Sequence, residues 1–61
     1  MTKIASRNGY EVFAKYDRTA GVYELFASDT GQDYIGCADS LSECRAIANE
    51  WIDSNTTRTL D

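Results

Sequence analysis

The sequence contains no histidine and no proline, and only two of its 61 residues are cysteine. Two thiols fall short of the four nitrogen or sulfur ligands of a structural zinc site, and they also exclude a dense disulfide framework. Without proline, the turns must depend on Gly, Asp, Asn and Ser. We therefore expect no metal and no cofactor, and chain reversals wherever those four residue types cluster.

Long apolar runs are missing too, because no stretch approaches the roughly 20 apolar residues that a membrane-spanning helix needs. Residues 1–8 carry charge but no apolar segment of the signal-peptide kind, so we expect no membrane association and a cytoplasmic location with reduced thiols. Hydrophobic residues make up 43% of the chain, which is typical of a globular protein. The length suits a single domain, whose small core would gain from burial against a second subunit or partner.

The net charge of −4 argues against direct, non-specific nucleic-acid binding, which requires cations that displace phosphate counterions. The same charge suits a basic surface on another protein, although it also serves solubility alone. The cations are scattered along the chain and form no stripe: Lys3, Arg7, Lys15, Arg18, Arg45 and Arg58.

Alternating apolar and polar residues predict three strands, over residues 9–16, 22–28 and 34–38. Turn-forming residues at 17–21 and 29–33 separate them. Strands joined by connections this short must be antiparallel. The helix-facing side of this sheet would carry Tyr10, Val12, Ala14, Tyr23, Leu25, Ala27, Ile35 and Cys37.

A helix is predicted over residues 40–54, because Ser40 and Glu43 are spaced as a capping box. An apolar stripe follows at helical spacing: Leu41, Cys44, Ile47, Ala48, Trp51 and Ile52. Residues 55–61 are predicted to be a flexible tail. The sequence thus predicts an α+β fold, with a three-stranded antiparallel sheet at 9–38 packed on one C-terminal helix and preceded by an N-terminal segment at 1–8.

The opposite, open face of the sheet would hold Phe13 and Phe26, with Val22 and Tyr34 nearby. Aromatic residues on an exposed face are typical of protein interfaces. Carboxylates from the same face and the following turn would add acidic complementarity: Glu11, Glu24, Asp29 and Asp33. A one-residue slip in register would exchange the two faces, and the N-terminal segment or the tail could cover the aromatic residues.

The sequence contains few candidates for catalytic residues. Asp29-Thr30-Gly31 matches the tripeptide of aspartic proteases, but those enzymes pair two Asp in a cleft, and the tripeptide is also ordinary turn chemistry. Asp29 and Asp33 lack the further oxygen ligands of a calcium loop. Cys37 and Cys44 are both predicted to face the core as structural thiols, and whether they can pair stays open. We therefore expect that the protein is not an enzyme.

Several segments together resemble the small accessory proteins of phages and plasmids, including anti-CRISPR inhibitors. These segments are Gly9-Tyr10-Glu11-Val12, Ile35-Gly36-Cys37-Ala38, Ser40-Leu41-Ser42-Glu43 and Glu50-Trp51-Ile52. The resemblance is one of size and style, and it implies an acidic sheet-and-helix domain that binds a host protein or protein–nucleic acid complex. No individual residue role follows from it.

The resulting hypothesis is a non-enzymatic inhibitor that occupies a basic or nucleic-acid-handling surface of a host defence complex of the CRISPR-Cas type. Phe13, Phe26 and Tyr34 would be its apolar anchors. Two alternatives stay open, namely a DNA-binding or regulatory module that uses its sheet, and a structural homodimer.

Overall fold

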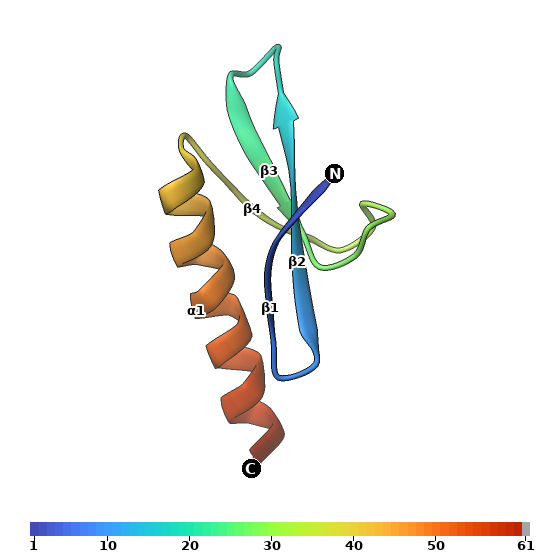
Figure 1. The fold of residues 1–61 in the computed structure, drawn as a ribbon, viewed down its shortest axis with the longest axis vertical. Helices are drawn as coiled ribbons and strands as arrows, with labels where there is room; N and C mark the ends of the chain where they lie inside the picture. The colour runs from blue at the N-terminus through green and yellow to red at the C-terminus, as the bar shows by residue number, and fades with distance from the viewer. Residues whose placement is uncertain (61) are drawn as a thin grey trace.

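The computed structural model describes residues 1–60, with side chains through residue 56, as a four-stranded antiparallel sheet and one long helix (Figure 1). The strands lie in the order β1-β2-β3-β4. Their bounds, with that of the helix, are Thr2–Arg7 for β1, Tyr10–Asp17 for β2, Val22–Phe26 for β3, Tyr34–Ala38 for β4 and Leu41–Leu60 for α1. The predicted α+β class with a C-terminal helix is confirmed, and the predicted number of strands is wrong by one.

The additional strand, β1, occupies most of the segment that was expected to precede the sheet. It pairs with β2 through a two-residue turn, in which Arg7 lies opposite Tyr10. Asn8 and Gly9 have φ angles of 54° and 83°. Positive φ at both central positions is the requirement of a type I′ hairpin turn, and Asn-Gly satisfies it best. The chain therefore begins its sheet at Thr2.

The connections between the next strands follow the predicted turn chemistry. Asp17 Oδ1 accepts hydrogen bonds from the backbone N–H groups of Thr19 and Ala20, at 3.0 and 3.2 Å. Gly21 donates its N–H to the Asp17 carbonyl at 2.7 Å and has a φ of 72°. These contacts close the β2–β3 hairpin.

Strand β3 ends at Phe26, two residues earlier than predicted, because Ser28 belongs to the following loop. The Ser28 carbonyl accepts the Gly31 N–H at 3.3 Å, and its hydroxyl accepts the Gln32 N–H at the same distance. Gly31 has a φ of 78°. The turn interpretation of Asp29-Thr30-Gly31 is thereby confirmed.

Helix α1 begins as predicted and ends later. The Ser40 hydroxyl accepts the Glu43 N–H at 3.3 Å, which caps the first turn. The helix then continues to Leu60, so residues 55–60 are not the tail that we expected, and Asp61 lies outside the described residues. Within residues 1–60, the helix lacks the apolar length that would be needed to span a bilayer.

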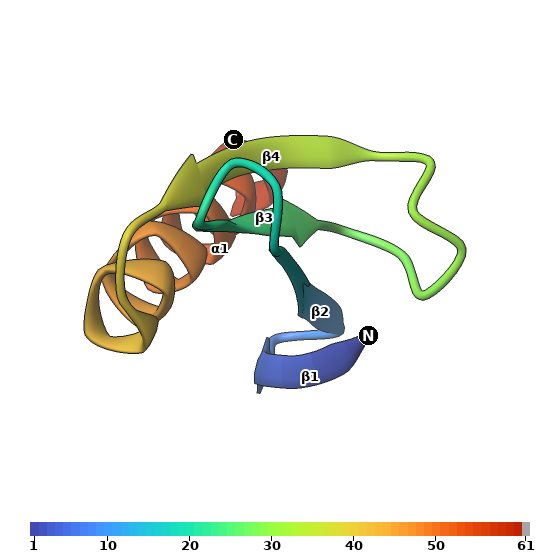
Figure 2. The same cartoon turned by 90° about the horizontal axis from the view of Figure 1, so that it is seen from above.

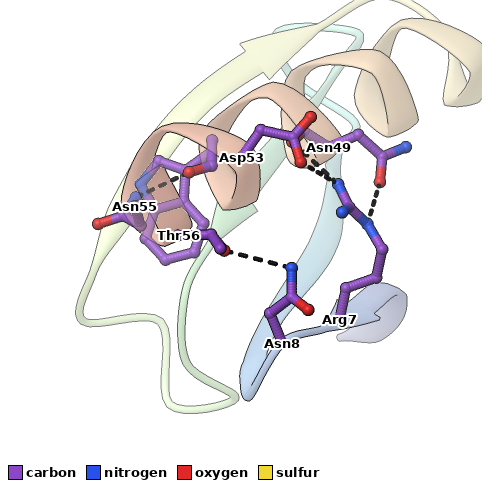
Figure 3. Close-up of polar contacts among 7 residues, drawn as sticks. Arg7, Asn8, Asn49, Asp53, Asn55 and Thr56 are labelled. Atoms are coloured by element: carbon purple, nitrogen blue, oxygen red, sulfur yellow. Dashed lines mark hydrogen bonds and ion pairs between the residues drawn. The ribbon is translucent and has the colours of Figure 1, made fainter. Parts of the chain in front are cut away.

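The far end of α1 is joined to the β1–β2 hairpin by polar contacts (Figure 3). Arg7 Nη2 lies 2.8 Å from Asp53 Oδ1 and 3.2 Å from the Asn49 carbonyl. The Asn8 amide donates to the Thr56 hydroxyl at 3.3 Å. The Arg7 contacts precede Ser54, and the Asn8 contact reaches the part of the helix beyond it, where the sequence has weak helix formers.

The core lies between the sheet and α1. It consists of Val12, Ala14, Leu25, Ala38, Cys44, Ala48 and Ile52. Tyr10, Tyr23 and Ile35 pack against this core as half-buried side chains, on the face predicted for them. Tyr10 and Trp51 meet edge to face, with ring centroids 5.6 Å apart. The predicted pairing of helix stripe and sheet face is therefore correct in its main part.

Three residues depart from that prediction, and one of them, Ala27, lies beyond the end of β3 and outside the core. Cys37 is exposed on the open face, because Leu25 pairs with Gly36 while Phe26 pairs with Tyr34, so that Ile35 is an extra residue in a β-bulge. The bulge shifts the alternation and turns Ala38 inward. Leu41, the first residue of α1, is 42% exposed.

Candidate functional site

Three aromatic residues form a continuous row across the face of the sheet opposite α1. Phe13 on β2 pairs with Phe26 on β3, and Phe26 pairs with Tyr34 on β4. The rings of Phe26 and Tyr34 meet edge to face, with centroids 5.7 Å apart. We call Phe13, Phe26 and Tyr34 the aromatic row. The alternation of the strands placed all three on this face correctly.

The row is not equally open along its length. Phe13 and Phe26 are half-buried, whereas Tyr34 is 57% exposed. Lys3 on β1 lies opposite Phe13. Met1 lies over the β3–β4 loop, because a Cβ on Gly31 would come within 2.8 Å of the Met1 methyl group. The N-terminal strand thus borders the row on one side, and Tyr34 is its most accessible member.

The predicted carboxylates take different positions around this row. Glu24 lies between Lys15 and Cys37 in the neighbouring cross-strand row. Asp29 and Asp33 are exposed in the loop that joins β3 to β4. Glu24 thus lies beside the row on β3, and Asp29 and Asp33 belong to the loop that connects Phe26 to Tyr34.

Glu11 differs from the other three carboxylates, because it forms an ion pair. Its Oε2 lies 3.0 Å from the Lys3 ammonium. Both side chains are about half exposed, so the pair is an ordinary surface ion pair that adds little stability. Because the Glu11 charge is compensated within the chain, the acidic border rests on Asp29, Asp33 and Glu24, the last of which has Lys15 directly opposite.

Cys37 joins the site although the sequence placed it in the core. A hydrogen bond with the Cys37 thiol is the main cause that raises the pKa of the Tyr34 phenol, and the Glu24 carboxylate contributes to the same shift. The phenol, which is protonated at neutral pH already at its ordinary pKa, offers an uncharged, polar tip beside its ring. The missed signal is the bulge at Ile35, which hydrophobic alternation alone does not reveal.

The two thiols should react differently with alkylating reagents. Cys37 is exposed on the open face. Cys44 lies on α1 in the core with no exposed surface, and burial raises the pKa of its thiol. Iodoacetamide should modify Cys37 in the native protein and reach Cys44 only in denaturant, as peptide mass spectrometry would show. Fast labelling of Cys44 in a native Cys37→Ser variant would contradict this packing.

Among the residues that the structure describes, no three Cys, Asp or Glu side chains come together as a metal site requires. Asp29 lies in the turn between β3 and β4. What the open face provides is contact surface, with aromatic rings, a phenol hydroxyl and a bordering set of carboxylates.

The chain is thus a small α+β domain that presents an aromatic and acidic sheet face. No protein family, curated protein or solved structure matches it. Its function must therefore be inferred from its own residues.

Proposed function

We propose that this protein is a non-enzymatic binding protein that docks its open sheet face on a basic surface of another protein. The observation that carries the proposal is the aromatic row, in which Phe13, Phe26 and Tyr34 lie in register across three strands and Tyr34 is 57% exposed. Aromatic side chains dominate the binding energy of protein interfaces. An interface would bury the exposed part of this row.

The row is well suited to binding because its side chains are already held in place. Strand pairing fixes Phe26 between Phe13 and Tyr34, and edge-to-face contact orients the Tyr34 ring. A preordered side chain loses less conformational entropy on binding than a mobile one. The half-buried phenylalanines thus support the Tyr34 ring, and Tyr34 is the residue that would insert into a partner.

The charge of the molecule indicates the chemistry of the partner. Glu24, Asp29 and Asp33 border the row, and the whole chain has a net charge of −4. A basic surface would attract this face and accelerate association, more strongly at low salt. Basic surfaces that handle nucleic acid satisfy this requirement. A host defence complex of the CRISPR-Cas type is therefore the proposed target, with the protein encoded by a phage or mobile element and active in the host cytoplasm.

The electrostatics of the open face disfavour the DNA-binding alternative. Lys3 forms its ion pair with Glu11, and Lys15 lies directly opposite Glu24. Each of these lysines is therefore beside a carboxylate that would face the phosphates of DNA unfavourably. A homodimer through the same face is the remaining alternative, and the experiment below separates it from the proposal.

Tyr34→Lys should abolish capture of the partner, whereas Tyr16→Lys should preserve it. Both tyrosines are at least half exposed, but Tyr16 pairs with Tyr23 on the helix side of the sheet. Placing a cation in the row removes an anchor and repels a basic surface. We expect at least about a 30-fold loss of affinity, equivalent to a hot-spot effect of about 2 kcal/mol.

The measurement is affinity capture from bacterial lysate, followed by mass spectrometry and titration of the purified partner. Both variants should first show the circular dichroism of the wild type. A basic protein retained by wild type and Tyr16→Lys, lost by Tyr34→Lys, and bound less tightly as salt increases would support the proposal. Equal retention by Tyr34→Lys would reject the assigned face. Recovery of the chain only with itself would establish the homodimer instead.

A further inference from the structure

The sheet has two edges, and they differ in chemistry. Strands β1 and β4 lie at opposite margins of the molecule (Figure 2). Strand β1 carries Lys3 and Arg7 and has a bulge near Ile4. Charges and bulges are the features by which sheet edges avoid further pairing. Strand β4, with the sequence Tyr-Ile-Gly-Cys-Ala, contains no charged residue.

A groove of about 310 Å³ lies next to β4, between that strand and the helix. Its apolar lining comes from Ile35 on β4 and from Ile47 and Trp51 on α1, with Glu50 and Ser54 at the same site. The opposite side of the helix, at Asn49 and Asp53, contacts Arg7 (Figure 3). The groove thus belongs to the β4 edge, and a strand added there would lie beside it.

Acidic residues stand at both ends of this uncharged strand. Asp33 precedes Tyr34 and Asp39 follows Ala38, and both are exposed. Glu50 adds a third carboxylate at the groove. An incoming segment would therefore meet backbone hydrogen-bonding groups and apolar surface in the middle, with negative charge at each end.

This arrangement of charge distinguishes between occupants. An antiparallel pairing of β4 with a second copy, centred on Gly36, would set Asp33 of one chain opposite Asp39 of the other, twice. A parallel pairing in register would set each aspartate opposite its own copy. Like charges directly opposite each other destabilise strand pairs. The edge therefore disfavours self-association and favours a strand with cationic ends.

We propose that the β4 edge accepts an extended segment of a partner protein by strand addition. The segment has a short uncharged stretch with Lys or Arg on either side, and it places one apolar side chain in the groove beside Ile35, Ile47 and Trp51. Backbone hydrogen bonds provide affinity in this mode, and alternate side chains provide specificity. The segment would pair with the outer edge of β4, whereas the aromatic row lies on the open face, and the two surfaces adjoin at Asp33 and Tyr34.

The probe is the capped peptide Lys-Thr-Ile-Thr-Val-Thr-Lys, compared with the same peptide ending in Glu on both sides. Trp51 is the sole tryptophan and lines the groove, so its emission reports occupancy directly. Amide hydrogen exchange reports pairing along β4. We expect a saturable change in emission, about tenfold slower exchange within residues 34–38, and about tenfold weaker binding of the Glu-ended peptide.

The charge requirement is tested with Asp33→Lys/Asp39→Lys, which changes two exposed side chains. This variant should keep the wild-type circular dichroism and bind the Glu-ended peptide better than the Lys-ended one. A Lys3→Ala variant, altered at the opposite edge of the sheet, should bind the Lys-ended peptide as wild type does. Absence of saturable binding at millimolar peptide, equal affinity of both peptides, or a β4 edge already protected in a dimer without peptide would each overturn the proposal.

Discussion

Replacing Ile52 with Ala should lower the free energy of unfolding by about 3 kcal/mol, within the usual range for a truncated core isoleucine. Ile52 has no exposed surface and lies in the central core between α1 and the sheet. The substitution removes buried methylene groups and leaves a cavity that neighbouring side chains fill only in part. In a chain of 61 residues, such a loss is a large fraction of the total stability.

Ile47→Ala is the matched control, since it makes the same chemical change on the same helix. Ile47 is only half-buried, at the groove beside β4. Its truncation should lower the free energy of unfolding by about 1 kcal/mol, because folding buries less apolar surface at position 47 than at position 52. Urea unfolding followed by circular dichroism measures both variants. Equal losses for Ile47→Ala and Ile52→Ala would show that the helix is rotated from the described orientation.

Deletion of residues 1–8 should abolish cooperative folding. The deletion removes β1, and with it the strand partner of β2 from Tyr10 to Ala14. It also uncovers the part of the core against which Ile4 and Ala5 pack, and it removes the Arg7 contacts to the helix. Unpaired backbone groups and newly exposed apolar surface then act together on a domain with little stability to spare.

The deletion tests whether the domain needs all four strands or only the three that the sequence first suggests. We expect the shortened chain, started with Met before Gly9, to lack a sigmoidal thermal transition in circular dichroism. The full-length Lys3→Ala variant is the control, because it removes only an exposed ion pair and should unfold nearly as wild type does. A shortened chain that melts within about 5 °C of the wild type would make β1 dispensable.

Local chemistry in the sequence was enough to predict much of this fold. The spacing of Ser40 and Glu43 located the helix start, and hydrophobic alternation put Val12 and Leu25 toward the helix with Phe13 and Phe26 on the other face. In each case a short-range rule and the tertiary packing agree. The aromatic part of the candidate site was predictable for the same reason.

The missed elements depend on longer-range contacts or on one overlooked turn. Strand β1 was indicated by Asn8-Gly9, the strongest hairpin signal that a dipeptide provides, although its flanking residues alternate weakly. Beyond Ser54 the helix receives a hydrogen bond from Asn8 to Thr56, a contact from the other end of the chain that helix propensity does not include.

Two features of the site itself were missed for related reasons. The exposure of Cys37 follows from a bulge that hydrophobic alternation does not encode. The compensation of Glu11 by Lys3 follows from strand β1, so it could not be foreseen without that strand.

Hydroxyl-radical footprinting of the complex with the captured partner tests the central claim most directly, because it reports side-chain exposure residue by residue. Tyr34 and Tyr16 are 57% and 50% exposed and lie on opposite faces of the sheet, so they serve as probe and internal reference. Docking through the aromatic row predicts that complex formation lowers the oxidation rate of Tyr34 and of neighbouring Cys37, while that of Tyr16 is unchanged. Protection of Tyr16 with Tyr34 still oxidised at its free rate would contradict the assignment of the open face as the binding surface.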